Sequence, residues 1–257
     1  MIARNQIAVH RRKFLTGAAA GLGGLALGGC DRLSQSTDVK RVLSSAENLN
    51  LYVQRLLLTP GQLAREYSQA DIARVFKPNG SINPADESYR AHVSNGFADW
   101  RLQVSGLVER PGVFSLADLK AMPPRTQITR HDCVEGWSAI GKWTGVPLAQ
   151  VLMRAGLKPQ ARYLVFGCAD TLDGARYYES IDLVDAIHPQ TILAYDLNGE
   201  SLPVANGAPL RLRLERQLGY KMTKYIMRID AVDSFGSIDG GKGGFWEDRG
   251  YEWYAGI

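Results

Sequence analysis

Short apolar segments separated by turn-forming residues run from Trp100 to Val232, and this pattern constrains the fold more than any other feature. Such segments, with partial alternation of apolar and polar residues, are typical of β-strands. The expected strands are residues 100–108, 127–131, 163–166, 192–195, 210–214 and 225–232. A short helix is expected after Ser115, where Asp118 completes a capping-box variant, and a second over 147–155, before Gly156. The chain is therefore predicted to be an α+β protein with mixed β-sheets.

The other segments are expected to be helix or loop. Residues 31–75 are predicted to be a helical N-terminal segment, because apolar side chains recur there at helical spacing. Residues 77–96 and the glycine-rich stretch 236–250 are predicted to be loops. The sequence contains no GxGxxG or P-loop pattern, so nucleotide binding has no support from a motif.

The first 30 residues have the features of an export signal. They contain four basic residues and no acidic one, and they include an uncharged run, residues 14–29. That run is shorter than the roughly 20 residues that span a bilayer. The segment Arg11-Arg12-Lys13-Phe14-Leu15 resembles a twin-arginine signal, which the exporter of folded proteins reads. Residues 1–30 are therefore predicted to direct the folded protein to the periplasm through the twin-arginine export machinery, a route used when a cofactor is inserted first.

The end of this signal resembles a lipobox. In Leu27-Gly28-Gly29-Cys30, the cysteine would carry lipid, become the mature N-terminus and anchor the protein to the inner membrane. The alternative is that Cys30 only lies near an ordinary cleavage site.

The net charge of the chain resides in the same segment. The chain has 30 basic and 26 acidic residues, and removal of the four basic residues of the signal leaves 26 of each. The remainder is formally neutral, so its charge gives no support to a nucleic-acid partner. The three cysteines are too few for a disulfide scaffold in a chain of this length.

Cys133 is the first candidate for chemistry, because it directly follows a predicted strand. Arg130 and His131 precede it and are expected to lower its thiol pKa and so favour the thiolate. A thiolate is a nucleophile or a soft metal ligand. The alternative is a cysteine buried as a small apolar residue.

A second polar cluster follows the loop Asn206-Gly207-Ala208-Pro209. Arg211 and Arg213 are two residues apart on a predicted strand and should share one face, and a turn at residues 219–221 can bring further donors back toward them. Converging cations suit a phosphate or another compact anion. The alternative is a solvated basic strand paired to Glu215. The basic residues of this cluster are Arg211, Arg213, Arg216, Lys221 and Lys224.

Together the two clusters resemble the molybdopterin-binding domain of the sulfite oxidase superfamily, which includes exported methionine-sulfoxide reductases. The motifs are His131 to Ser138, Trp143 to Leu148 and Asn206 to Arg211. The resemblance implies a single domain of the sulfite-oxidase type over residues 76–235, followed by a glycine-rich and aromatic tail at 236–257.

The resemblance also implies roles for individual residues. Cys133 would be the thiolate ligand of molybdenum, beside the dithiolene sulfurs of a molybdopterin without an attached nucleotide. Arg130 and His131 are the candidates for polar groups that face the substrate. The predicted catalytic residues are therefore Cys133, Arg130 and His131. The predicted cofactor-binding residues are Asn79, Cys168, Asn206, Arg211, Lys221, Met222, Thr223 and Lys224.

An enzyme of this kind transfers an oxygen atom to or from a small substrate and exchanges electrons with a haem b membrane subunit or a c-type cytochrome. Sulfoxide reduction is the leading expectation. Sulfite oxidation, and a non-enzymatic lipid-anchored binding protein on the same fold, are the alternatives. Two departures leave the substrate open: Arg216-Gln217-Leu218 replaces the tryptophan-lysine-tyrosine segment of the sulfoxide reductases, and no immunoglobulin-like domain follows Asp233. The aromatic tail is expected to line the pocket mouth, dock a redox partner or pack against the domain.

Overall fold

The computed structural model describes residues 36, 45, 49–57, 59 and 61–257. The chain divides into two units, Met1–Gln54 and Arg55–Ile257, and the second contains all the described strands. The predicted export signal, Cys30 and most of residues 31–48 lie outside the described residues. Within the described residues, no helix combines the length and apolar character needed to cross a membrane.

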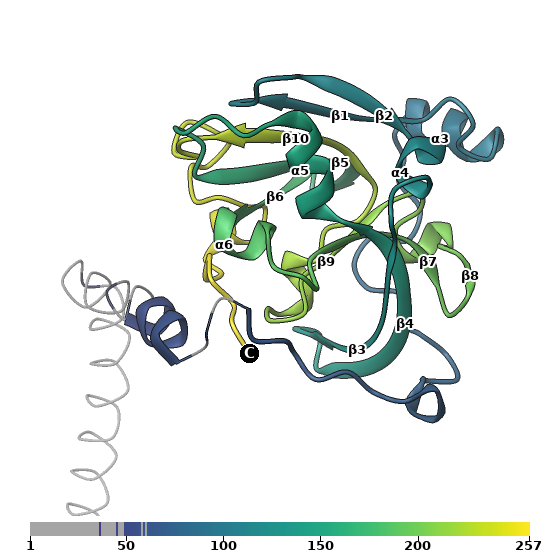
Figure 1. Ribbon diagram of the computed structural model, residues 1–257, viewed down its shortest axis with the longest axis horizontal. Coiled ribbons are helices and arrows are strands. Elements are labelled where there is room, and N and C mark those ends of the chain that lie inside the picture. The colour runs from purple at the N-terminus through teal and green to yellow at the C-terminus, as the bar shows by residue number, and fades with distance from the viewer. Residues whose placement is uncertain (1–35, 37–44, 46–48, 58, 60) are drawn as a thin grey trace, which may run out of the picture. The chain divides into compact units, whose positions relative to one another are not determined.

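The first sheet has five strands and mixed direction (Figure 1). Strand β1 pairs in parallel with β10, and the other neighbours in this sheet are antiparallel. The strand order is β2 (Gly112–Ser115), β1 (Arg101–Gly106), β10 (Ile226–Val232), β5 (Tyr163–Leu172) and β6 (Ala175–Asp182).

The second sheet is antiparallel and contains the long, curved strand β4 (Figure 1). Strand β9 pairs with β7 beside the main path of the sheet. The strands are β3 (Arg125–Cys133), β4 (Trp137–Pro147), β7 (Ile192–Leu197), β8 (Glu200–Ser201) and β9 (Arg211–Arg213).

Short helices connect the strands. Helix α4 begins with the capping box of Ser115 and Asp118, and α5 ends at Gly156 with φ of 70°, so both predicted helices are confirmed. The α-helices are α3 (Glu87–Ser94), α4 (Leu116–Lys120), α5 (Leu148–Ala155) and α6 (Leu183–Ala186). The 3₁₀ turns are η1 (Gln69–Asp71), η2 (Val204–Asn206), η3 (Gly219–Lys221) and η4 (Glu247–Arg249).

The main hydrophobic core draws on both sheets and on α4 and α5. Side chains alternate along a strand, so Leu212 of β9 enters this core while Arg211 and Arg213 face the opposite way. Both guanidinium groups lie over the ring of Trp143, at 5.5 and 4.3 Å from its centroid. The predicted shared face of Arg211 and Arg213 is confirmed, and so is the α+β fold with mixed sheets.

Two predicted segments differ from the structure. Residues 49–57 are helical, but 61–75 form no α-helix, because their backbone bonds to the β3–β4 hairpin instead. The amide of Tyr67 donates to the carbonyl of Ile128 (2.8 Å) and that of Ala73 to the carbonyl of Ile140 (3.0 Å). The predicted loop at 77–96 contains α3, which Asp86 caps by accepting from the Tyr89 amide.

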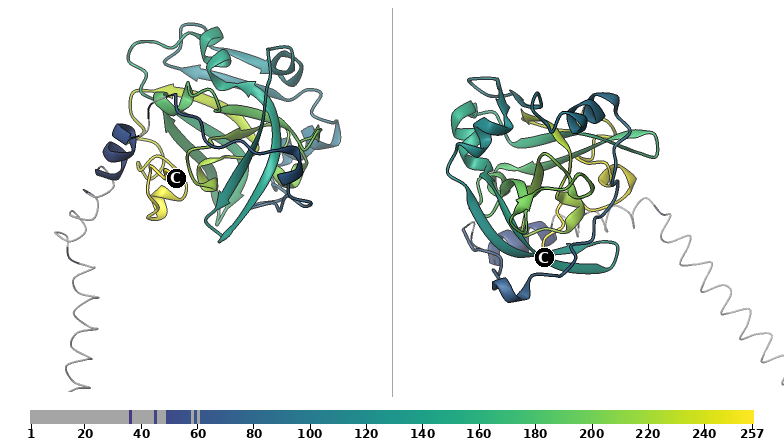
Figure 2. Two further views of the ribbon diagram at one scale, coloured as in Figure 1. Left: turned by 60° about the horizontal axis from the view of Figure 1, so that its bottom comes forward. Right: turned by 90° about the vertical axis from the view of Figure 1, so that its right-hand side faces the viewer.

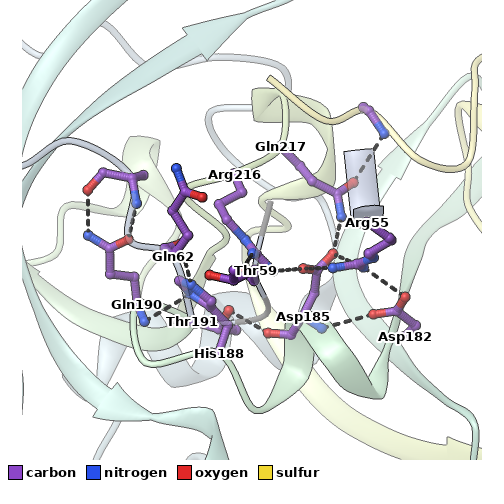
Figure 3. Close-up of polar contacts among 12 residues, drawn as sticks. Arg55, Thr59, Gln62, Asp182, Asp185, His188, Gln190, Thr191, Arg216 and Gln217 are labelled. Carbon is purple, nitrogen blue, oxygen red and sulfur yellow. Dashed lines mark hydrogen bonds and ion pairs between the residues drawn. The ribbon is translucent and has the colours of Figure 1, made fainter. Parts of the chain in front are cut away.

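A buried polar network holds Arg55, Thr59, Gln62 and Ala64 on the body (Figure 3). Asp185 of α6 accepts hydrogen bonds from Arg55 (3.0 and 2.9 Å), Arg216 (2.7 Å) and Gln217 (2.5 Å). Gln190 accepts from the Ala64 amide (2.7 Å) and donates to its carbonyl (3.0 Å). Burial alone would raise the pKa of Asp185, but its arginine partners outweigh that effect and hold the pKa below its ordinary value of 3.8.

The Asp185→Asn variant is expected to lose about 3 kcal/mol of unfolding free energy, because it leaves two arginines without their shared carboxylate. The pKa of Asp185 in the folded protein lies below the unfolded value of 3.8. The ionised carboxylate therefore makes its full contribution to the unfolding free energy above pH 3.8. The contribution disappears as pH falls through the folded pKa. Urea unfolding at pH 7 and below pH 4 measures both effects. The control is Asp182→Asn, because Asp182 is partly exposed and an asparagine can also cap α6. Equal stability of wild type and Asp185→Asn would contradict the expectation.

Candidate active site

A cavity of about 330 Å³ lies at the end of β3, beside residues 79–81, 219–224 and 246–251. Cys133 lies on its wall. Four of the predicted cofactor-binding residues line the same cavity: Asn79, Met222, Thr223 and Lys224.

Cys133 is placed by a tight hairpin. It is the last residue of β3, and the chain turns through Val134, Glu135 and Gly136 into β4. The Gly136 amide donates to the Cys133 carbonyl (3.0 Å), and Gly136 has φ of 84°, a conformation that favours glycine. The Cys133 side chain is 8% exposed. Burial raises the pKa of its thiol, while the Glu135 amide, Arg211 and Lys77 act in the opposite direction.

Arg130 and His131 do not line this cavity, and the prediction that they lower the thiol pKa is wrong. Side chains alternate along a strand, so Arg130 points to the opposite face of β3 from His131 and Cys133. On that face it forms an ion pair with Asp132 (2.9 Å) and lines a separate cavity. His131 is fully buried and contacts Arg213 through Nδ1 (3.1 Å). Burial, and then Arg211 and Arg213, hold the pKa of His131 well below its ordinary value, so the ring is neutral.

The five cations of the second cluster are all buried, which excludes the solvated strand. Three of them have buried carboxylate partners. These are Arg213 with Glu215 (2.9 and 2.7 Å), Arg216 with Asp185 (2.7 Å), and Lys221 with Glu247 (2.6 Å) and Glu179. The alternative pairing with Glu215 therefore holds for Arg213 alone.

Arg211 and Lys224 form no ion pair in the part of the chain that the structure describes. Arg211 is fully buried and donates to Asn79 Oδ1 (3.1 Å) and the Asn206 carbonyl (3.2 Å). Lys224 donates to the carbonyls of Asn79 (2.6 Å) and Ala205 (3.0 Å). Burial and Arg213 lower the pKa of Arg211 to about 9, and burial and Arg211 lower that of Lys224 to about 7. The cavity therefore adjoins two cations that have no ion-pair partner among the described residues.

Two further donors lack partners at this place. Arg211 Nε and Asn206 Nδ2 are buried without a hydrogen-bond acceptor. Buried donors are normally paired, and a buried charge without a partner is costly. A bound anion with several acceptor oxygens would supply an ion-pair partner for the cations and hydrogen-bond acceptors for these donors. The residues thus fit a phosphate-bearing ligand that extends from the cations toward the Cys133 thiol.

Four predicted cofactor residues, namely Asn206, Arg211, Cys168 and Lys221, lie off the wall of the cavity. Cys168 is buried behind it, with Sγ 2.9 Å from Thr223 Oγ1, and burial raises its thiol pKa well above the ordinary value. Lys221 is held between the two glutamates already described. The described residues contain no group of three or more His, Cys, Asp or Glu side chains that could hold a metal ion.

Other wall residues were not expected. Glu135 accepts from the Gly80 amide (3.2 Å) and from Trp137 Nε1 (3.0 Å), which ties the 79–81 loop to the hairpin. Asp170 of β5 accepts from Ser81 Oγ (2.7 Å), its Oδ1 has no partner, and burial raises its pKa. Glu135 lies within the motif around Cys133 and could have been singled out, whereas nothing in the sequence distinguishes Asp170.

Comparison with known proteins places these features in a family. The model of the oxidoreductase molybdopterin-binding domain matches residues 90–235. YedZ1 of Azospira oryzae, provisionally named a protein-methionine-sulfoxide reductase subunit, is 41% identical over 247 residues, which cover 96% of this chain and 87% of that protein.

The protein-methionine-sulfoxide reductase catalytic subunit MsrP of Xanthomonas campestris pv. campestris is 41% identical over 145 residues, 52% of this chain and 45% of that protein. The match therefore spans about half the length of MsrP. Among solved structures, the sulfane dehydrogenase SoxCD of Paracoccus pantotrophus matches with a TM-score of 0.49 and 28% identity, over 53% of this chain and 39% of that one.

The anion affinity of the cofactor-free protein is expected to fall about tenfold between pH 6 and pH 8, because Lys224, with a pKa of about 7, loses its charge in this range. Calorimetric titration with sulfate measures this, since sulfate keeps its charge throughout. Lys224→Arg should flatten the profile, because arginine stays protonated. An unchanged affinity across this range in the wild type would contradict the assignment.

Proposed function

The chain belongs to the oxidoreductase molybdopterin-binding domain family, and from that premise we propose that it reduces a sulfoxide to a sulfide in the periplasm. It is an oxidoreductase of the sulfite oxidase superfamily, and molybdopterin is its cofactor. The reaction consumes one sulfoxide, two electrons and two protons and yields one sulfide and one water.

The proposal rests on one arrangement: the Cys133 thiol and Lys224 line one cavity, and the fully buried Arg211 donates to Asn79 on the same wall (3.1 Å). Neither cation has an ion-pair partner among the described residues. Cys133 would hold the molybdenum, and metal binding would remove its thiol proton. Arg211, Lys224 and Asn206 would hold the anionic part of the molybdopterin. When bound, the cofactor supplies a metal that exchanges the oxygen atom and the electrons with substrate and carrier.

The protein's own residues position these groups. The β3–β4 hairpin fixes Cys133, and Glu135 holds the 79–81 loop against it. Asp170 lies on the same wall with one carboxylate oxygen free, and its raised pKa lets it hold a proton at a higher pH than an ordinary aspartate. Asp170 is therefore our candidate to deliver a proton to the departing oxygen.

The names of the relatives support a sulfoxide as the substrate, since both are protein-methionine-sulfoxide reductases. Both are also called subunits, which supports a partner protein. The electrons would arrive singly from a haem b membrane subunit or a c-type cytochrome. The twin-arginine motif supports export of the folded, cofactor-loaded protein, and Cys30 supports a lipid anchor.

With reduced viologen as electron donor, the cofactor-loaded protein should reduce methionine sulfoxide. The same screen includes an N-oxide, and sulfite oxidation is assayed in the opposite direction. Sulfite oxidation without sulfoxide reduction would contradict the proposed substrate. An absence of molybdenum from the purified protein would contradict the proposal that it is a molybdenum enzyme.

Cys133→Ser should reduce turnover at least about 100-fold, because the metal loses its protein thiolate. The matched control is Cys168→Ser, since that thiol is buried off the cavity wall and a serine can keep the contact to Thr223. It should retain most of the activity. Circular dichroism verifies that both variants fold, and retained turnover in Cys133→Ser would refute the ligand role.

A further inference from the structure

The C-terminal tail, residues 236–257, is fixed to the body by buried charge. Lys221 of η3 donates to Glu247 of η4 (2.6 Å) and to Glu179 of β6, and all three side chains are buried. Burial alone would lower the pKa of Lys221, but the two glutamates outweigh that effect and raise it, so the lysine is charged. Asp248 accepts from the hydroxyl of Tyr178 (2.6 Å). These contacts hold the tail, yellow in Figure 2, in one place.

The tail supplies part of the cavity wall. Trp246 and Tyr251 line the same cavity as Cys133. Their rings lie 5.2 Å apart, and Tyr251 meets Tyr220 edge to face at 5.2 Å. These three aromatic side chains, Trp246, Tyr251 and Tyr220, are here called the aromatic wall. Tyr251 is 41% exposed, so the wall reaches from the cavity to solvent.

The aromatic wall stands beside the strand that carries Cys133. Gly219, which precedes Tyr220, packs so closely on β3 that a Cβ there would lie 2.4 Å from His131 Cε1 and 3.1 Å from the Asp132 carbonyl oxygen. Tyr220 therefore lies near the end of β3, where Cys133 is located. Tyr177, another residue of the cavity, donates to the Tyr220 carbonyl (2.8 Å) and fixes this turn.

The cavity thus has two chemically different parts. On one side Lys224 lines the cavity and Asn79 connects it to the buried Arg211, and these residues fit the anionic cofactor. On the other side the aromatic residues Trp246 and Tyr251 line the cavity and offer no charge to an anion. The aromatic side therefore suits an uncharged group, such as the substituent of a substrate.

We propose that the aromatic wall is the substrate-specificity surface of this enzyme and that it selects sulfoxides with an apolar or aromatic substituent. The inference rests on the proposed sulfoxide reduction. Aromatic faces attract apolar and aromatic groups, and they offer little to a small, strongly polar oxide. The open end at Tyr251 admits a substituent that extends to solvent.

The test compares two substrates with the cofactor-loaded enzyme, methyl p-tolyl sulfoxide and dimethyl sulfoxide. In Trp246→Leu, the KM for the aryl sulfoxide should rise about tenfold, because a ring contact is lost. The KM for dimethyl sulfoxide should change less than about twofold, and kcat and the molybdenum and pterin content should stay unchanged. Trp246→Phe keeps a ring and should give an intermediate KM even if the leucine variant folds poorly.

The matched control is the same change at Trp253, which belongs to the tail but stacks on Phe235 (5.6 Å) and does not line the cavity. Trp253→Leu should leave the ratio of the two KM values unchanged. An unchanged ratio in both Trp246 variants would overturn the proposal, and loss of pterin from them would assign the wall to the cofactor instead. A wild-type enzyme that reduces neither sulfoxide would refute the proposed function itself, and the inference would fall with it.

Discussion

The electrostatics of the cavity depend on an imbalance between buried cations and buried carboxylates. Five basic side chains of the 211–224 region are buried, and three of them meet carboxylates within the protein. Arg211 and Lys224 do not, and their pKa values fall to about 9 and about 7 because burial penalises their charges. An anionic cofactor would reverse that penalty, so binding and stability are coupled at this site.

The paired cations have a different task, which is to join distant segments. Arg216 shares Asp185 with Arg55 and so connects the start of the body to the turn before η3. Lys221 connects η3 to β6 and to the tail. Lys221 lies between the wall residues Tyr220 and Met222, so this second connection also holds wall residues in position. Removal of either partner leaves a buried charge uncompensated.

Much of the architecture could be predicted from the sequence, because capping residues and apolar patterns act locally. Strand β4 escaped prediction, since Gly141 and Lys142 interrupt its apolar pattern and its conformation is set by pairing with β3 and β7. Cys133, Asn79, Thr223 and Lys224 line one cavity, and the roles that the resemblance implied for them stay a prediction. The expected effect of Arg130 on the thiol failed because strand alternation sends that side chain to the other face. The partners of Lys221 could not be predicted, since Glu179 and Glu247 lie 42 and 26 residues away in the chain.

The central claim is that the Cys133 thiolate is the protein's ligand to molybdenum at the edge of the cavity that Arg211 and Lys224 adjoin. X-ray absorption at the molybdenum edge, recorded for the loaded wild-type enzyme and for Cys133→Ser, tests it most directly. The account predicts that the variant retains molybdenum with one sulfur neighbour fewer than the wild type. The same number of sulfur neighbours in both proteins would contradict it.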